Sequence, residues 1–344
     1  MAKGGTVTIK DVAREAQVSV ATVSRALNGQ ENVAAGVRKA VQDAAQRLRY
    51  QPHAAARSLS SRRTQTIGVV LPDLYGEFFS ELIRGIDAVA RAHRRHLLVS
   101  SYHGHPEEQG EALRAMRGRV DGLLVLSPYA DQPGFLADNL PAGLPVVMLG
   151  AQSQDPEHAS LGIDNHGGAV AMVAHLVEAG HQRIAFIGGP QDNSDARERL
   201  HGYRDALAQR LPKQKPWELQ GDFDEASGYE AGKQILTAKQ RPDAVFAAND
   251  MMALGCLYAF NEAGVRVPDD IALAGFDDIP LARFVHPTLT TIRVNIAELG
   301  GRAMAQLLEA VDSHGGSQAA SAQVLATELI VRQSSAARTP RGAG

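Results

Sequence analysis

The chain has 344 residues, and its 44% hydrophobic content is enough for two or three domains with buried cores. The net charge of −3 conceals an asymmetry, because residues 1–63 hold 11 Lys and Arg against 4 Asp and Glu, while the remainder holds 24 against 34. A basic segment neutralises phosphate and an acidic body is repelled by it, so this pattern favours an N-terminal segment that binds nucleic acid. On charge alone, the alternative to nucleic-acid binding is a basic helix that is simply exposed to solvent.

Cysteine usage and apolar patterning indicate the compartment. The single cysteine, Cys256, lies among apolar residues of a helical pattern, which predicts a reduced thiol in a core. Residues 1–8 carry only Lys3 as a charge and lack the apolar stretch of a secretory signal, and nowhere do about 18 apolar residues follow one another. We therefore expect a cytoplasmic protein that does not engage a membrane.

Three helices are expected in the basic segment. The first covers about residues 9–16 and begins with a capping box, in which Thr8 and Asp11 satisfy exposed amides reciprocally. The second follows a tight turn and is capped by Ser19, and the third covers about residues 35–48. Apolar residues recur at three- and four-residue intervals in these helices, so the three can share one small core.

A short hinge and a linker are expected next. Residues 53–59 favour a helix of about two turns, well short of the ~12 to 15 residues that an isolated helix needs, so this helix requires external packing. The polar run at 60–66 is typical of a linker, and the apolar run at 67–71 has the length of a buried strand. We expect a headpiece at 1–52, a hinge helix and linker at 53–63, a core at 64–334 and a flexible tail at 335–344.

Strand-like runs alternate with helical stretches through the rest of the chain, which predicts βαβ units and parallel sheets. After the first strand these runs cover residues 97–101, 122–126, 146–149, 184–187, 244–247 and 271–274. A new helix after Asp164 and Asn165 predicts that a second α/β layer begins near residue 162. We expect two lobes with a ligand cleft between them.

Sequence motifs in the headpiece are specific. Residues 8–13 (TIKDVA) and 18–28 (VSVATVSRALN) closely resemble the headpiece of the lactose/galactose repressor (LacI/GalR) family. Further matching stretches include 50–52, Leu59, 120–123, 180–181, 184–185, 248–250, 275–278 and 289–292, so the resemblance covers essentially residues 6–334. It implies an all-α helix-turn-helix headpiece, an α/β two-lobed periplasmic-binding-protein-like core with parallel sheets, and dimers that bind operator DNA.

Three positions depart from the family pattern. Gln17 occupies a turn position where Gly is frequent, and His53 follows the hinge proline where Asn is common. Val294 replaces a frequent Gln that the resemblance places beside the effector. The last departure bears on the identity of the ligand and not on the fold.

The resemblance and the chemistry of base edges together define a DNA-binding set. Arg25 leads it, because arginine can pair with guanine O6 and N7 and so supply roughly 1 to 3 kcal/mol of discrimination. Thr22 and Ser24 suit phosphate contacts, and the resemblance makes Leu59 a wedge in the minor groove, with Ala56 against the partner hinge. The full set is Thr8, Ser19, Val20, Ala21, Thr22, Ser24, Arg25, Asn28, Tyr50, His53, Ala56 and Leu59.

The resemblance also implies an effector site. One wall carries Phe78 and Phe79 with Tyr75 close by, and the other carries Asp195, Arg199, Phe223, Asn249 and Asp277. Aromatic rings can cover the apolar face of a pyranose while Arg, Asn and Asp hold its hydroxyls, which favours a sugar. A purine is the alternative, although regulators of that type carry an arginine where Asn193 stands. His103 and His105 follow a strand at the expected ligand side, where histidines are more often only solvated.

These features predict a sequence-specific repressor of carbohydrate-utilisation genes that binds a pseudo-palindromic operator as a homodimer. Effector binding would close the lobes and change the hinge separation. The remote alternative is a sugar-acting enzyme using Asp164, Asp250 or Asp277, but catalytic, metal and phosphate-loop motifs are lacking, so we expect no enzyme, no cofactor and no metal. A transport-type binding protein is disfavoured by the basic headpiece.

Overall fold

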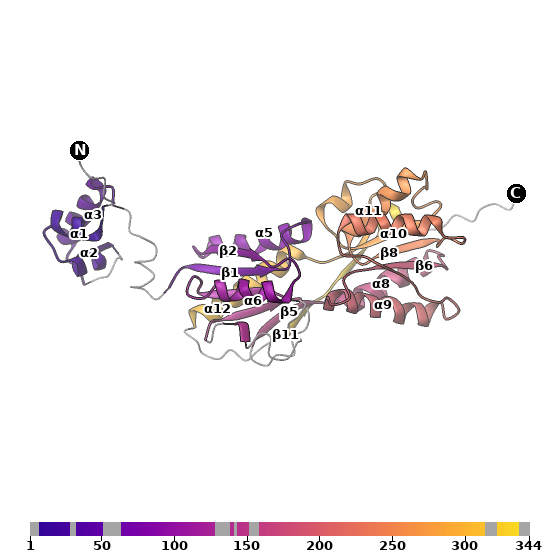
Figure 1. Cartoon of the computed structure of the whole chain (residues 1–344), viewed down its shortest axis with the longest axis horizontal. Coiled ribbons are helices and arrows are strands. Elements are labelled where there is room, and N and C mark those ends of the chain that lie inside the picture. Colours follow the sequence, from indigo (N-terminus) through magenta and orange to yellow (C-terminus); the bar gives the residue numbers. More distant parts are fainter. Residues whose placement is uncertain are drawn as a thin grey trace. The chain divides into compact units, whose positions relative to one another are not determined.

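The computed structural model describes residues 7–27, 32–50, 63–127, 138–140, 143–150, 158–313 and 322–336 (Figure 1). The chain divides into two compact units, Met1–Gln65 and Thr66–Gly344. The predicted hinge helix at 53–59 lies outside the described residues, as does the end of the tail from residue 337. Among the described helices, none is both long and apolar enough to cross a bilayer.

The first unit contains the three predicted helices, α1 (Ile9–Glu15), α2 (Val20–Leu27) and α3 (Ala35–Arg47). The capping box at the start of α1 is confirmed, since the Thr8 amide donates to Asp11 Oδ2 at 2.9 Å. Ser19 caps the second helix as predicted, because its Oγ accepts from the Thr22 amide at 3.1 Å. Gln17 has a φ of +53°, the left-handed conformation that glycine adopts most easily.

The core of this unit is small and aliphatic. One buried residue from each helix stands at its centre, namely Val12, Val23 and Val41, and each is 0% exposed. Alanines at 13, 26 and 44 fill the remaining contacts, so the helices approach closely. The helical periodicity therefore predicted both the helices and the residues that they bury.

The second unit is built on two six-stranded sheets. The first sheet has the order β11-β5-β4-β3-β1-β2 and is parallel throughout. Its strands are β1 (Thr66–Leu71), β2 (His96–Ser101), β3 (Gly122–Leu126), β4 (Val146–Leu149), β5 (Ala159–Ile163) and β11 (Ala322–Leu325). The helices α5 (Glu77–Ala92), α6 (Pro106–Ala115) and α12 (Ile296–Asp312) pack on it, and together these elements form the first lobe.

The second lobe repeats this architecture. Its sheet has the order β12-β10-β9-β8-β6-β7, parallel except for the antiparallel pair β10 and β12. The strands are β6 (Ile184–Gly188), β7 (Trp217–Gln220), β8 (Ala244–Ala247), β9 (Ala272–Asp277), β10 (Thr290–Arg293) and β12 (Glu328–Ile330). Its helices are α8 (Asn165–Glu178), α9 (Ser194–Arg210), α10 (Glu225–Thr237) and α11 (Asp250–Glu262). The predicted two-lobed α/β fold with parallel sheets is confirmed.

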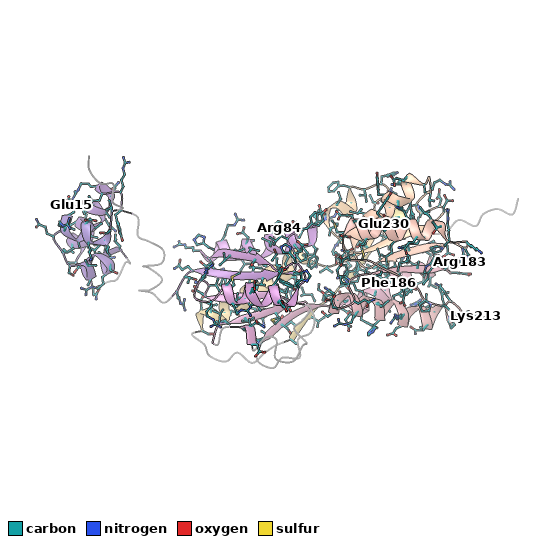
Figure 2. All side chains as sticks on the ribbon, in the orientation of Figure 1. Glu15, Arg84, Arg183, Phe186, Lys213 and Glu230 are labelled. Atoms are coloured by element: carbon teal, nitrogen blue, oxygen red, sulfur yellow. The ribbon has the colours of Figure 1, made fainter. Side chains whose placement is uncertain are left out.

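Aromatic packing centres the second lobe. The Phe186 ring stacks on Tyr203 at 4.9 Å and meets Phe246 at 5.3 Å, and all three are fully buried. Figure 2 shows Phe186 inside this lobe, whereas Arg183 and Lys213 reach its surface. Cys256 is also buried, as predicted, and this burial raises the pKa of its thiol.

The chain crosses between the lobes three times. The first crossing follows β5 and leads into α8, where the Asp164 side chain caps the helix by accepting from the Gly167 amide at 2.9 Å. The second leads from β10 back to α12, which packs against α5, and the third joins β11 to β12. The sequence predicted the first crossing near residue 162, but it gave no sign of the other two crossings.

The contact between α5 and α12 depends on glycine. A Cβ atom on Gly300 would lie 2.4 Å from the Leu82 carbonyl oxygen, and one on Gly85 would lie 1.9 Å from the Ala297 carbonyl oxygen. Backbone atoms cannot move aside as the end of a flexible side chain can, so only glycine allows these helices to lie this close. The adjacent Gly301 is less crowded, with its nearest neighbour at 3.5 Å.

We predict that Gly300→Ala lowers the free energy of unfolding of the core by about 1 to 3 kcal/mol, because the added methyl forces the helices apart. Gly301→Ala is the matched control on the same helix and should be neutral or stabilising by about 0.5 to 1 kcal/mol through helix propensity. Urea unfolding of both variants measures the difference. Equal effects of the two substitutions would contradict the account of this interface.

Candidate functional site

A cavity of about 420 Å³ lies between the two lobes of the core. Its walls are formed where strands end at their carboxyl edges, since Pro72 follows β1, Asp222 follows β7 and Asn249 follows β8. This is the edge at which open α/β sheets bind ligands. The first lobe contributes Pro72, Asp73, Tyr75, Gly76, Phe78, Phe79, His103, Gly104 and Leu126, and the second contributes Pro190, Asp192, Asn193, Asp195, Arg199, Asp222, Phe223, Asp224, Asn249, Met251 and Asp277.

The structure brings the predicted effector residues together. All eight, Tyr75, Phe78, Phe79, Asp195, Arg199, Phe223, Asn249 and Asp277, line this one cavity. His103 also lines it, whereas His105 stands at the N-cap position of α6 and does not. Val294, which the resemblance places beside the effector, is buried in the hydrophobic core and is absent from the lining.

Several lining residues were missed by the sequence reasoning. Asp73, Asp192, Asp222 and Asp224 add four carboxylates to the two predicted ones, and Met251 adds an apolar contact. Asp222 and Asp224 flank Phe223, which was predicted, so neighbours of a predicted residue at a strand end were the available signal. Asp73 lies just beyond β1, a position that the sequence marked only as the end of a strand.

Arg199 is held by contacts from several segments of the second lobe. Its Nε donates to Asn165 Oδ1 at 2.8 Å, and its Nη1 donates to the Ala248 carbonyl at 2.6 Å. The same nitrogen forms an ion pair with Asp277 Oδ1 at 3.2 Å, with both side chains at most 5% exposed. The guanidinium carbon also lies 3.8 Å from the centroid of the Phe276 ring. A buried charge needs such compensation, and these contacts fix the orientation of Arg199 beside the cavity.

Burial controls the ionisation of the carboxylates around Arg199. Desolvation raises the pKa of Asp277 to about 6, although the Arg199 guanidinium opposes the shift. Burial likewise raises the pKa of Asp195, which accepts a hydrogen bond from Asn165 Nδ2 at 2.8 Å. The Asp277 carboxyl group therefore titrates near pH 6, about one pH unit below neutrality.

Asp250 lies behind this group and does not line the cavity. Its two oxygens accept bonds from the Thr291 hydroxyl at 2.6 Å and from the Ile279 amide at 3.0 Å. Burial is the first cause that raises the pKa of Asp250, and the nearby Asp277 charge is the second. These bonds join the start of α11 to the residues that follow β9, so Asp250 positions the Asp277 segment.

Backbone conformations at the cavity are unusual. Three lining residues other than glycine have left-handed backbone, with φ values of +47° at His103, +65° at Phe223 and +111° at Asp277. Asp278, next to the lining, follows at +54°. Such conformations are costly for residues with side chains and persist where surrounding contacts enforce them, which is common at functional sites.

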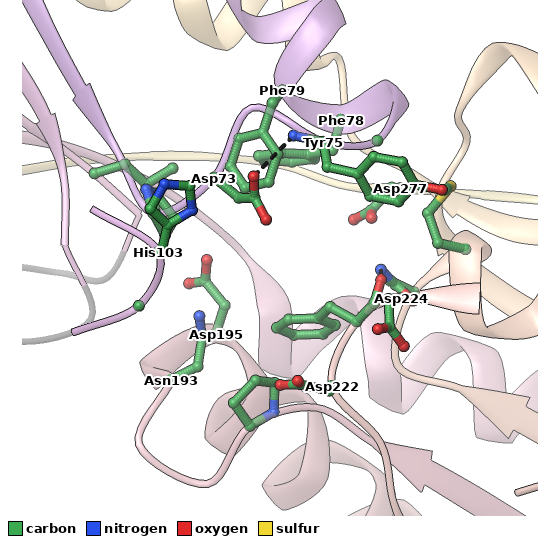
Figure 3. Close-up of a pocket in the computed structure, with 18 of the residues that line it drawn as sticks. Asp73, Tyr75, Phe78, Phe79, His103, Asn193, Asp195, Asp222, Asp224 and Asp277 are labelled. Carbon is green, nitrogen blue, oxygen red and sulfur yellow. Dashed lines mark hydrogen bonds between the residues drawn. The ribbon is translucent and has the colours of Figure 1, made fainter. Parts of the chain in front are cut away.

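Hydrogen bonds join the lobes at the edge of the cavity. The Tyr75 hydroxyl of the first lobe donates to Glu225 Oε1 of the second at 3.1 Å, and Glu77 Oε2 accepts from the Leu281 amide at 2.9 Å. Figure 3 shows the rings of Phe78 and Phe79 above the cavity, and these two rings meet edge to face at 5.5 Å. The site thus combines aromatic rings, mainly from the first lobe, with charged groups that come mainly from the second.

The predicted DNA-binding residues of the headpiece gather at one helix. Val20 and Arg25 project from the exposed side of α2, while Val23 and Ala26 on its other side are buried. Ala21 and Ser19 are also exposed, Thr22 and Ser24 are half-buried, and Thr8 is exposed beside α1. Tyr50 packs partly against the headpiece core. Asn28, His53, Ala56 and Leu59 lie outside the described residues.

A basic three-helix unit with one exposed helix, together with a charged cavity between two α/β lobes, defines a DNA-binding regulator that responds to a small molecule. The chain matches the family described as bacterial regulatory proteins, lacI family, over residues 8–53, and the periplasmic binding protein-like domain over residues 173–335.

Individual relatives match almost the whole chain. Catabolite control protein A of Priestia megaterium is 35% identical over 89% of this chain and 95% of its own length. The ribose operon repressor of Escherichia coli is 37% identical over 88% of this chain and 93% of its own. The HTH-type transcriptional repressor PurR of Photobacterium profundum is 37% identical over 88% and 92%. The chain therefore belongs to the LacI family of bacterial transcriptional regulators, as its motifs predicted.

Solved structures agree with this assignment. The lac repressor dimer bound to operator and the anti-inducer ONPF is 31% identical, with a TM-score of 0.85 over 97% of this chain and 100% of that chain. The complex of the transcriptional regulator CelR with cellobiose is 32% identical, with a TM-score of 0.70 over 95% and 99%. A LacI family regulator of Enterococcus faecium with bound ribose is 27% identical, with a TM-score of 0.72 over 80% and 100%.

We predict that ligand affinity at the cavity falls as the pH drops through about 6. An ionised Asp277 that contacts the ligand would accept its hydrogen bonds, so below the pKa of about 6 the ligand would first have to displace a proton. The loss approaches about tenfold per pH unit below that pKa. Calorimetry between about pH 5 and about pH 8, with a compound that raises the melting temperature, measures it. If the ligand affinity does not change with pH across this range, Asp277 does not contact the ligand.

Proposed function

We propose that this protein represses carbohydrate-utilisation genes and that a sugar bound between the lobes sets its affinity for operator DNA. The observation that carries the proposal is the composition of the cavity, in which the Phe78 and Phe79 rings face Arg199 and its carboxylate neighbours. Rings can cover the apolar face of a sugar while carboxylates, amides and a guanidinium hold its hydroxyls. The relatives solved with cellobiose and with ribose support this choice.

A purine effector is the second candidate, favoured by the 37% identity to repressors named PurR. Asn193 weighs against it, because regulators of that type carry an arginine at that position. The Asn193 side chain here caps α9, accepting from the Ala196 amide at 3.0 Å. A melting screen that includes hypoxanthine and guanine separates the two candidates.

For DNA, we propose that α2 enters the major groove and that Arg25 reads a base edge. Two copies of the chain would bind a pseudo-palindromic operator. The lac repressor, a relative of this chain, is solved as a dimer bound to operator. The hinge segment, with Leu59 as wedge and Ala56 against its partner, would order on the kinked duplex. The proposed domains are the headpiece 1–52, the hinge 53–63, the core 64–334 and the tail 335–344.

Regulation rather than catalysis is the role that the relatives support, since those described above are transcriptional repressors and regulators. We place the protein in the cytoplasm, where operator DNA lies. Effector binding would rotate one lobe against the other through the three crossings and alter the separation of two hinges.

We predict that Arg25→Ala weakens binding to the preferred genomic fragment by about 1 to 3 kcal/mol, because a base-reading arginine is lost. Lys39→Ala is the control, since it removes one positive charge from an exposed position on α3 and should weaken specific and random duplexes equally. Gel shifts at one fixed salt concentration measure both. If the Arg25 variant keeps the wild-type preference, the base-reading role fails.

We also predict that Asp277→Asn and Arg199→Lys abolish the rise in melting temperature that the effector causes. Lysine keeps the charge of Arg199 but cannot form its planar fork, and asparagine keeps the shape of Asp277 without its charge. A ligand at about 100 times its Kd stabilises the wild type by about 2.7 kcal/mol, so its loss is easily measured. Circular dichroism checks that each variant is folded, and an undiminished shift in both would refute the site.

A further inference from the structure

The lining of the cavity is strongly acidic. It contains the aspartates Asp73, Asp192, Asp195, Asp222, Asp224 and Asp277, while Arg199 and His103 are the basic side chains among the lining residues that the structure describes. Helix N-termini offset part of this charge, because α5, α9, α10 and α11 begin at the cavity and each carries about half a positive charge. The carboxylates outnumber these compensating charges, so the electrostatic balance disfavours an anion.

Three of these N-termini, those of α9, α10 and α11, are partly closed to an anion by side-chain caps, whereas α5, which follows Gly76, has none. The Ala196 amide of α9 donates to Asn193 Oδ1 at 3.0 Å, and the Ser227 amide of α10 donates to Asp224 Oδ1 at 2.8 Å. The Met252 amide of α11 donates to Asn249 Oδ1 at 2.9 Å. Uncapped amides are what makes a helix N-terminus bind phosphate, and side-chain oxygens already occupy one amide in each of these three helices.

Several hydrogen-bond donors on the lining are committed to the protein. The Asn249 amide nitrogen donates to the Phe223 carbonyl at 2.8 Å, and the Tyr75 hydroxyl donates to Glu225 at 3.1 Å. Arg199 donates through Nε and Nη1 to Asn165 and to the Ala248 carbonyl. A ligand that presents only acceptors, such as a phosphate, therefore competes with these protein acceptors for the same donors.

The hydrogen-bond acceptors on the lining can accept further hydrogen bonds from a ligand. An aspartate offers about four lone-pair sites, whereas the Asp195 and Asp224 side chains each accept one hydrogen bond from protein groups at 2.8 Å. Asp73 uses one oxygen for the amides of Leu74 and Tyr75. Figure 3 shows the carboxylates of Asp73 and Asp195 directed into the space between the lobes from opposite walls. These groups match a ligand that donates hydrogen bonds.

We propose that the cavity selects an unphosphorylated, hydroxyl-rich sugar and rejects its phosphate ester. This inference rests on the proposed sugar effector and adds the charge state of the ligand to it. Each sugar hydroxyl donates one hydrogen bond, so a free sugar fits the acceptor-rich lining, whereas a phosphate brings about two negative charges and acceptors only. Repulsion among the carboxylates already raises the pKa of Asp222, after the effect of burial, through Asp224 and Asp192. A dianion would add to this repulsion.

The test uses matched pairs on the full chain. A melting screen of free mono- and disaccharides identifies the sugar that stabilises the protein, and calorimetry at one ionic strength then compares it with its phosphate ester. The ester is expected to bind at least about tenfold more weakly than the free sugar. An ester that binds as tightly as its parent, or more tightly, overturns the inference.

Two variants that each remove one negative charge test whether the lining carboxylates cause the weaker binding of the phosphate ester. Asp222→Asn removes a carboxylate from the lining with little change in shape and should narrow the affinity ratio between parent and ester. Asp269→Asn is the charge-matched control, because its carboxylate is 60% exposed and lies 3.3 Å from Arg266 outside the cavity. If both variants narrow the affinity ratio between sugar and ester equally, the ratio depends on the net charge of the protein, and the role of the lining is overturned.

The same screen separates failure of this inference from failure of the proposed function. Stabilisation by hypoxanthine or guanine and by no sugar would overturn both the charge preference and the sugar effector, while operator binding in gel shifts would stand on its own. A screen in which no free sugar stabilises the protein also overturns the inference. Discrimination against the ester without any preference for a genomic fragment would support the inference and contradict the proposed repressor.

Discussion

The buried guanidinium of Arg199 is the group on which the architecture of the ligand site depends. It is presented by α9 and joins the start of α8 through Asn165, the end of β8 through Ala248 and the end of β9 through Asp277. Removing one partner of such a buried pair leaves a charge without compensation, at a cost of about 3 to 5 kcal/mol. Because the left-handed backbone at Asp277 persists only under surrounding contacts, this ion pair also supports the conformation of the loop after β9.

The two lobes are joined in a way that lets a ligand act on both. Three chain crossings connect them, and the Tyr75 and Glu77 side chains of the first lobe contact the second at the edge of the cavity. A ligand held by Phe78 and Phe79 on one side and by Arg199 and its neighbours on the other gains most when the lobes are closed. Its binding energy therefore favours one arrangement of the lobes over another, which is the requirement for a conformational switch.

The elements that the sequence predicted well are those set by local chemistry. The capping box of Thr8 and Asp11, the Ser19 cap and the apolar periodicity of the headpiece act within a few residues, and the structure confirms each of them. The parallel strands were predictable for a similar reason, since short apolar runs between helical stretches are typical of buried strands. Motifs shared with a known family supplied the eight lining residues named beforehand.

What the sequence left out depends on contacts between distant segments. The return of α12 and β11 to the first lobe follows from packing against α5 and pairing with β5, and neither neighbour is close in the chain. The carboxylates of Asp73, Asp222 and Asp224 belong to loops whose convergence requires both lobes to be in place. The left-handed backbone of Phe223 could not be predicted either, because this conformation is expected from sequence mainly at residues such as glycine and asparagine.

The central claim is that the cavity and the DNA-binding headpiece are energetically coupled. The most direct measurement is the affinity of the full chain for its preferred genomic fragment, with and without a saturating concentration of the sugar that stabilises it. Coupling of the two sites should change this affinity by about 5- to 150-fold, and by linkage the fragment must change the affinity for the sugar by the same factor. An operator affinity that is the same with and without the bound sugar would show that the two sites are not coupled.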